Sequence, residues 1–473
     1  MISKNLEENI QTLKKVFQCS SDFYVRTIQK KISYVLLESL CSDDKISDFF
    51  MKEITRFDYS NLFSSIKNTI PNNKLKTISD MKEIIFYLQN GFTIIFIEGE
   101  QNAIGIETKN SLNRGIESSN NEVVLRGPKD SFTENILLNM GLIRKRIKDT
   151  NLSFQEFVIG RRTKTKVILS YLKDLIDEKK RKQIEKKLNN IDIDSILDSS
   201  TIKEFLSTWK TAFPTILSTE RPDLVSMALL EGKFIILVDN SPIALIIPGL
   251  FIDYLHNTED EYLSPINSSF TRVLRILCFF ITLLTPAIYV SIITFNKNLI
   301  SKSIYETLTV QREGLFVSAF LEIFLLVTVF EILRESDIRI PNKMGTSIGV
   351  VGALVLGDAA VSAGLVSSIA VIITAITAIS GLLFSDIDFV YALRIWRYLF
   401  LVGAACQGLI GVFVIFIVLL FHLMHLKSLD IPYLSPIYPF QKEEVKKLWI
   451  RVSKRNDTNR PSYLKPKDKI KKK

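Results

Sequence analysis

The chain has 473 residues, of which 47% are hydrophobic, and it carries a formal net charge of +10. The hydrophobic excess lies after residue 265 and is larger than a wholly soluble protein needs. Because most of the positive charge lies after Lys442, it belongs to one basic stretch and gives little reason to expect a nucleic-acid-binding protein. Beside a membrane, such a stretch favours contact with anionic lipid.

The first 250 residues mix helical and strand patterns, which predicts a soluble α/β region. The region opens on a polar, charged segment without the apolar core of a signal peptide, so we expect internal segments to direct membrane insertion. A helical pattern from Leu6 to Phe17 and a strand pattern over 31–40 begin a first α/β subdomain, placed at residues 1–110. Residues 81–108 end it with a helix, a glycine and a hairpin.

The same order of elements returns in residues 154–250, which we predict to be a second, related α/β subdomain. The sequence KVILSYLKDL at 166–175 resembles KISYVLLESL at 31–40, and a helix, a glycine and a hairpin follow again. Gly91 and Gly232 are predicted to end the two helices, because glycine readily adopts the left-handed conformation found there. A chance match between degenerate patterns is the alternative.

Residues 111–153 separate the repeats and are predicted to form a linking region that contains one helix. Apolar residues recur at helical spacing from Phe132, and Ser131 or Asp130 would cap the first turn. Basic residues beginning with Arg144 favour the carboxyl end of this helix.

Two polar motifs are candidates for an interface between subdomains or with a partner. The first is an Arg-Gly-Pro turn that could hold a phosphate, although a lone motif of this kind more often serves a structural turn. In the second, charged residues either bind a ligand or fix a turn, and Thr219 or Asp223 would cap the following helix. The candidate residues are Arg126, Gly127, Pro128, Arg144, Glu220, Arg221, Pro222 and Asp223.

The second half is predicted to be a helical transmembrane domain over residues 265–425, followed by a basic cytoplasmic tail over 426–473. Five apolar windows are long enough to cross a bilayer: 273–295, 314–332, 347–365, 366–384 and 399–423. If the α/β region and the tail are both cytoplasmic, the number of crossings is even. Either one window is then not a full crossing, or the short segment 243–256, more typical of an interfacial or re-entrant element, adds a sixth.

The stretch Pro341–Phe384 is rich in glycine and alanine and nearly free of charge. It is too long for one membrane helix, so a turn is expected between Asp358 and Ser368. Small residues recur every four positions, which allows close packing of helices. Alternatively, the stretch lines a pore around a symmetry axis, where apolar residues gate by dewetting. The pore-lining or gating candidates are Gly349, Val351, Val355, Asp358 and Ser362.

Carboxylates inside apolar segments are costly unless they have a use. We expect Glu322, Glu331 and Asp358 to face a polar path, to lie near an interface, or to pair with Arg334 or Arg339. A further acidic group precedes the first window and would raise the cation concentration at a pore mouth, or else is a solvated loop. Its members are Glu259, Asp260 and Glu261.

No arrangement of residues indicates an enzyme, a cofactor or a metal site. The three histidines lie near apolar segments and lack the setting of a nucleophilic triad, and His422 and His425 have no third metal ligand. The four cysteines form no C-x-x-C pair, so the soluble part is expected to be reduced and cytoplasmic. Motifs of the P-loop, dinucleotide-binding and metalloprotease types are not found.

Several long motifs, in the same order, resemble the A subunits of GerA-type spore germinant receptors of endospore-forming bacteria. These motifs are residues 126–146, 219–248, 259–262 and 331–367, and the similarity extends over nearly the whole chain. The chain departs from the family pattern at 212–215, at Asn296 where histidine is common, and at Asp358 where glutamine is frequent. The last departure bears on ion preference.

The resemblance implies a receptor complex in the inner spore membrane, with a cytoplasmic two-subdomain region at the N-terminus. It also implies homo-oligomerisation into a pentameric, nutrient-gated ion channel, a transporter-like B subunit that binds the germinant, and a lipoprotein C subunit. We therefore predict a subunit that releases monovalent cations when a nutrient binds its partner. A non-conducting signalling scaffold and a secondary-transporter-like subunit are the alternatives, and the latter would need broken helices in two related membrane halves.

Overall fold

The computed structural model describes residues 2–17, 20–52, 61–70, 75–110, 122, 124, 126–207, 211–339 and 357–472. The chain divides into two units, which are considered one at a time. The α/β unit consists of Met1–Thr208, Ile216–Gly249 and Lys454–Lys473. The helical unit consists of Trp209–Thr215 and Leu250–Ser453, so the chain passes repeatedly between the two units.

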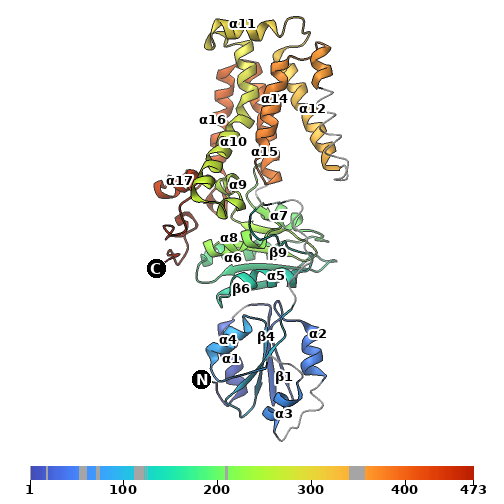
Figure 1. Cartoon of the computed structure of the whole chain (residues 1–473), viewed down its shortest axis with the longest axis vertical. Coiled ribbons are helices and arrows are strands. Elements are labelled where there is room, and N and C mark those ends of the chain that lie inside the picture. The colour runs from blue at the N-terminus through green and yellow to red at the C-terminus, as the bar shows by residue number, and fades with distance from the viewer. Residues whose placement is uncertain are drawn as a thin grey trace. The chain divides into compact units, whose positions relative to one another are not determined.

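The first α/β repeat is an antiparallel sheet with helices on both faces (Figure 1). Its strand order is β1-β2-β4-β5-β3, from β1 (Phe23–Ile28), β2 (Ile32–Leu37), β3 (Leu75–Ile78), β4 (Phe92–Ile97) and β5 (Ala103–Glu107). Helices α1 (Leu6–Val16) and α4 (Met81–Leu88) pack on one face; α2 (Asp43–Ile46), the π-helical η1 (Ser47–Met51) and α3 (Leu62–Thr69) pack on the other. Ile94 and Ile95 are adjacent in β4 yet enter different cores, because side chains alternate across a strand.

The second repeat has the same topology, with strand order β6-β7-β9-β10-β8. Its strands are β6 (Leu152–Ile159), β7 (Thr165–Leu172), β8 (Leu217–Thr219), β9 (Phe234–Val238) and β10 (Ala244–Ile247). Helices α5 (Ile136–Arg146) and α8 (Pro222–Glu231) share one core with this sheet. Helices α6 (Glu178–Asn189) and α7 (Ser199–Leu206) lie on the other face, where Arg181 of α6 covers the Tyr171 ring. The identical strand order confirms the predicted pair of related subdomains.

The helix ends differ in part from those expected. Gly232 ends α8 in the predicted left-handed conformation, with φ of 92°. The cap expected at Ser131 or Asp130 is wrong, because α5 begins only after Asn135, whose side chain accepts the amides of the first turn. Paired hydrogen bonds between Thr133 and the Asn139 side chain hold the preceding residues out of the helix.

Two further expectations about local structure are changed. Helix α8 begins on Pro222 and has no side-chain cap from Thr219 or Asp223. Residues 243–256 form β10 and the short α9 (Phe251–Leu255) rather than one continuous membrane segment, because residues 244–247 pair in the second sheet. Helix α5, expected in a linking region, contributes to the core of the second repeat.

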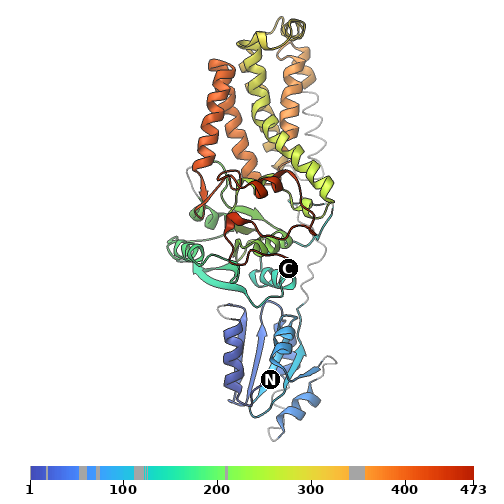
Figure 2. The ribbon, with the colours of Figure 1, turned by 90° about the vertical axis from the view of Figure 1, so that its left-hand side faces the viewer.

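The helical unit is built around α10, drawn in yellow in Figure 2, which packs against α14, α15 and α16. Its longer helices are α10 (Pro265–Thr294), α11 (Lys302–Val310), α12 (Ala319–Arg339), α14 (Ser368–Gly381), α15 (Ile387–Gln407), α16 (Leu409–His425) and α17 (Lys442–Trp449). Short elements are η3 (Thr258–Glu261), η4 (Lys297–Leu299), β11 (Lys427–Ser428) and β12 (Ile431–Pro432), and η5 (Ser462–Leu464) lies in the α/β unit. Among the described residues, α10 and α15 are long and apolar enough to cross a membrane, whereas α14 and α16 are apolar but shorter.

The predicted single span 399–423 is wrong, because the chain breaks at Gly408 into α15 and α16. Gly408 has φ of 61°, a conformation that glycine adopts without strain. The two helices then pack as a tight hairpin, in which a methyl group on Gly411 would lie 1.9 Å from the carbonyl oxygen of Gly403. The start of α15 is not visible as an apolar window, because Arg394 and Arg397 interrupt its apolar pattern.

The predicted basic tail, residues 426–473, is in part buried against the other elements. Tyr433 and Leu448 are buried in the helical unit, and Leu464 is buried in the α/β unit. In the α/β unit the Arg460 guanidinium donates to the Leu230 carbonyl oxygen at 3.0 Å. The backbone amide of Lys467 donates to the Leu175 carbonyl oxygen, also at 3.0 Å. Its lysine side chains stay largely exposed, so contact with anionic lipid stays a prediction.

Candidate functional site

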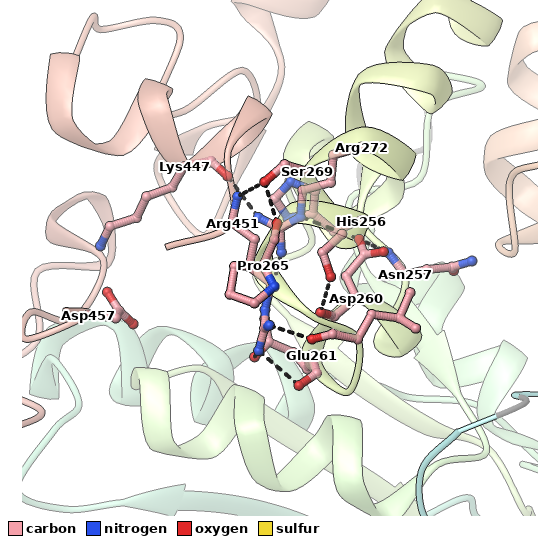
Figure 3. Close-up of polar contacts among 12 residues, drawn as sticks. His256, Asn257, Asp260, Glu261, Pro265, Ser269, Arg272, Lys447, Arg451 and Asp457 are labelled. Atoms are coloured by element: carbon pink, nitrogen blue, oxygen red, sulfur yellow. Dashed lines mark hydrogen bonds and ion pairs between the residues drawn. The ribbon is translucent and has the colours of Figure 1, made fainter. Parts of the chain in front are cut away.

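Asp260 is the centre of a charged cluster where α10 begins (Figure 3). Its side chain is buried in η3, and Arg275 of α10 binds both carboxylate oxygens, with one nitrogen–oxygen distance of 2.9 Å. Arg272, one turn earlier, approaches the same carboxylate at 3.4 Å. Burial would raise the pKa of Asp260, but the two guanidinium groups outweigh it and hold the pKa below its ordinary value. The carboxylate is therefore ionised and fixed to α10.

The same cluster attaches the tail to α10. The Arg451 guanidinium donates to the carbonyl oxygens of Glu261 and Leu263 at 2.9 and 2.8 Å, and its amide donates to Ser269 Oγ at 3.0 Å. The side chain of Arg272 donates to the carbonyl oxygen of Lys447 in α17 at 2.8 Å. These bonds fix α17 beside the first turns of α10.

His256 adds a neutral contact to this cluster. Its Nε2 atom donates to the Leu448 carbonyl at 3.2 Å, and burial lowers the pKa of the imidazole to about 3. The histidine is thus uncharged at neutral pH. Because Asp260 and Glu261 are both paired with arginines, the acidic group predicted at a pore mouth does not present three free charges. Cation attraction by Glu259, Asp260 and Glu261 stays a prediction.

Glu322 forms a second buried cluster, within the helices. Its carboxylate accepts both the amide and the hydroxyl of Ser367 at 2.6 Å, and Arg312 donates to it at 3.2 Å. Ser367 is also the N-cap of α14, so the negative charge lies at the positive end of that helix. Glu322 thus forms an ion pair with Arg312, which was not among the arginines expected to pair with it.

Glu331 of α12 forms a third cluster with α15. Its two carboxylate oxygens pair with Arg394, at 3.1 Å, and with Arg397. An ionised group in an apolar helical unit needs such compensation. The pairing explains how a helix that carries two arginines packs among apolar helices.

The predicted pore-lining residues are described only in part. Gly349, Val351 and Val355 lie outside the described residues. Asp358 and Ser362 are exposed on a helical segment at 357–362. The chain then turns with Gly364 at φ of 63°, within the range where a turn was expected.

In the α/β unit, the two polar motifs come together. Buried Arg221 binds Asp223 at 2.7 Å and donates to the carbonyl oxygens of Pro128 and Glu122 at 3.2 and 3.4 Å. The amide of Phe132 donates to the Glu220 carbonyl at 2.8 Å, and Pro222 starts α8. Arg126 and Gly127, named for a phosphate site, are exposed beside this cluster. The motifs therefore fix a turn, which supports the structural interpretation of both.

Arg144 joins the two α/β repeats through a buried ion pair that sequence analysis missed. Its side chain donates to Asp22 at 2.5 and 2.8 Å and to Ser20 Oγ at 2.7 Å. The guanidinium lies 4.9 Å from the ring centre of Phe154, and Ser39 donates a further bond to Asp22. Arg144 was expected to favour a helix end and was named among the candidates for an interface between subdomains, but nothing in the sequence marks Asp22 as its partner.

Residues Trp209–Thr215 belong to the helical unit although the chain on either side belongs to the α/β unit. Phe213 is buried in a cluster of aromatic rings whose centres lie 6.0–6.4 Å away, from Phe389, Trp396, His422 and Tyr433. Thr211 Oγ1 lies 2.9 Å from His422 Nε2, and Ser428 donates to the Thr215 carbonyl at 2.6 Å. Phe213 and Thr211 thus pack against α15 and α16 within the helical unit.

Within the described part of the chain, no group of three or more histidine, cysteine or acidic residues is arranged to hold a metal ion. The fold and the charged clusters together define a class: a duplicated α/β unit and an apolar helical unit in which the carboxylates of Asp260, Glu322 and Glu331 are paired with arginines. Two helices of that unit have the length and composition of membrane spans.

Comparison with known proteins places the chain within a family of this class. The family described as "Bacillus/Clostridium GerA spore germination protein" matches residues 11–463. The chain is 34% identical over 481 residues to Spore germination protein KA of Bacillus subtilis (strain 168), covering 99% of this chain and 88% of that protein. It is 35% identical over 387 residues to Spore germination protein GerLA of Bacillus cereus, covering 82% and 79%. The chain belongs to the GerA family of spore germination proteins, as its motifs predict.

A solved structure is also similar in part. The crystal structure of the N-terminal domain of the A subunit of the Bacillus megaterium spore germinant receptor GerK3 covers 53% of this chain and 97% of that chain, with 29% identity and a TM-score of 0.41. The GerA family consists of spore germination receptor subunits and is not a known enzyme class.

Proposed function

We propose that this protein is a membrane subunit of a nutrient-sensing spore germination receptor that oligomerises into a germinant-gated channel for monovalent cations. Its location would be the inner spore membrane, with the α/β unit and the tail in the cytoplasm. Its partners would be a transporter-like B subunit that binds the germinant and a lipoprotein C subunit. Family membership supports the receptor role, and the two long apolar helices support membrane association.

The contrast between paired and exposed carboxylates in the helical unit carries the channel proposal. Glu322 and Glu331 are paired with arginines. Asp358, the one acidic residue in the stretch 341–384, is exposed. An exposed carboxylate is costly in lipid but favourable beside a water-filled path between protomers, where acidic rings attract cations. We therefore propose that Asp358 faces a lumen, as would Ser362 one turn further on.

The test is cation flux through the receptor complex reconstituted in liposomes with its partners and a germinant. Asp358→Lys should reduce potassium flux on the order of tenfold or more, because it replaces an attractive charge by a repulsive one. Glu313→Gln, which removes an exposed carboxylate from the loop before α12, is the matched control and should leave flux unchanged. Absence of germinant-dependent flux through the unmodified complex would contradict the channel proposal, as would normal flux through the Asp358→Lys variant.

A non-conducting scaffold is the second candidate, favoured by the extent of the polar network that ties the tail, α9 and α10 together. It predicts that germination needs an intact α/β unit although the complex passes no ions. Counting protomers in the detergent-solubilised complex helps to separate the candidates: a closed ring supports a central pore, and a monomer argues against one.

A further inference from the structure

We propose that the tail segment 438–450, which contains α17, together with the first turns of α10, is an interfacial anchor that lies in the headgroup layer of the bilayer. The residues of this anchor are Ile266, Phe270, Tyr438, Phe440, Trp449 and Ile450. The proposal rests on the membrane embedding of α10 that is part of the proposed function. It adds a membrane-contacting element that is not itself a span.

The anchor residues expose an unusual amount of apolar surface. Ile266 is 82% exposed, Phe270 69% and Phe440 71%, and Trp449 and Ile450 are nearly half exposed. Monomeric soluble surfaces seldom gather so many large apolar side chains, and such a patch normally marks a contact with a membrane or a partner. The patch therefore needs an occupant.

Hydrogen bonds bring the two halves of the anchor together. The amide of Arg451, directly after Ile450, donates to Ser269 in the turn of α10 that carries Ile266 and Phe270. Arg272 donates to the carbonyl of Lys447, two residues before Trp449. Helix α17 thus lies beside the first turns of α10 (Figure 3 shows the polar contacts between these segments).

The length of α10 places this patch at the membrane surface. A helix of 30 residues is about 45 Å long, and the hydrocarbon core is about 30 Å thick. Arg272 and Arg275 are buried against Asp260 in the first turns, so the hydrocarbon begins after them. The turn that carries Phe270 then lies in the interface, where tryptophan and tyrosine rings are enriched.

Continuity along α10 favours lipid over a protein partner as the occupant. Val273 and Leu277 follow Ile266 and Phe270 at helical spacing, and they are 46% and 55% exposed. One outward stripe thus runs from the anchor into the apolar part of the helix. Exposed Lys442 and Lys446, four residues apart on α17, can reach headgroup phosphates while their stems cover apolar surface.

The experiment measures tryptophan fluorescence of the full-length protein in liposomes made with brominated phospholipids. Subtracting the emission of the Trp449→Phe variant from that of the unmodified protein isolates Trp449, because only three tryptophans are present. We expect bromines near the headgroup end of the acyl chains to quench Trp449 on the order of twofold more than bromines near the chain ends, as interfacial placement requires. The reverse pattern is expected for Phe280→Trp placed in the Trp449→Phe background, at an exposed position in the middle of α10.

Each outcome decides the proposal. Quenching of Trp449 by aqueous iodide without quenching by bromolipid would overturn it, since the patch would then face water. Protection from both quenchers would overturn it in favour of a protein partner or a second copy of the chain. If the tryptophan at position 280 is quenched by lipid and Trp449 is not, only the anchor fails; if neither is quenched, the membrane embedding fails as well.

Discussion

Replacing Arg144 with methionine should weaken the contact between the two α/β repeats. The change leaves the Asp22 carboxylate buried without its counter-ion, and the side chains of this pair are 2% and 0% exposed. Loss of one partner of a buried ion pair costs about 3–5 kcal/mol. That is a large part of the roughly 5–15 kcal/mol that holds a typical domain folded. Asp22→Leu combined with Arg144→Met should recover at least about 2 kcal/mol, because an apolar pair of similar volume carries no desolvation cost.

The same pair predicts how stability depends on pH. Burial would raise the pKa of Asp22, but Arg144 outweighs it and holds the pKa below its ordinary value. A group whose pKa is depressed by folding stabilises the protein above its unfolded pKa of about 4, and this contribution is lost as pH falls through the folded pKa. The free energy of unfolding of the wild-type α/β unit should therefore fall in acid, and this part of the pH dependence should disappear in the Asp22→Leu/Arg144→Met variant.

The assay is native-state hydrogen exchange of the full-length protein in detergent, which gives the free energy of opening from the exchange of amides in β1 and α5. The matched control is Arg181→Met, which breaks partly exposed ion pairs on α6 and should cost less than about 1 kcal/mol. A loss below about 1 kcal/mol for Arg144→Met would refute the reasoning, since a buried pair would then behave like an exposed one. A double variant no more stable than the single one would refute it too.

Three further changes test the helical unit. Gly411→Ala should lower the free energy of unfolding, followed by thermal denaturation of the detergent-solubilised protein, by about 1–3 kcal/mol, because its methyl would meet a carbonyl of α15. The control Gly357→Ala should be tolerated, because its methyl would meet only a side chain at 3.9 Å. Phe213→Ala should cost about 3–5 kcal/mol in the same measurement, with Phe213→Leu costing clearly less, and equal effects would argue against a packed ring cluster. Glu322→Gln should increase hydrogen exchange at the amide of Ser367, which now bonds to a carboxylate; unchanged exchange there would contradict the contact.

The repeated α/β fold could be predicted because its strands are continuous apolar runs. Strands such as β4 and β9 are buried on both faces, so few polar residues interrupt them, and each is followed by a tight turn. Gly232 marked a helix end for a reason that depends only on local backbone geometry. Features that depend only on neighbouring residues, such as an apolar run or a helix-ending glycine, can be recognised from the sequence alone.

The polar clusters could be predicted only in part, because their partners are distant along the chain. Glu322 and Glu331 were conspicuous as carboxylates in apolar segments, but local spacing did not point to Arg312, Arg394 or Arg397, with which they form ion pairs. The arginines that pair with Glu331 lie in α15, and their charges interrupt the apolar pattern by which that helix could be recognised in the sequence. Asp22 gave no signal, because a single aspartate in a loop is ordinary until a guanidinium buries it.

The chain order of the two units has a consequence for how the protein is made. The α/β unit takes in residues 454–472, which the ribosome supplies only after it has translated the whole helical unit. Until then, the Leu175 and Leu230 carbonyl oxygens bound by this segment lack these contacts, so the unit stays incomplete during synthesis. Residues 454–472 can therefore pack only after the helical unit has been synthesised. A chain truncated before residue 454 would leave the surface around Leu175 and Leu230 exposed to quality-control proteases.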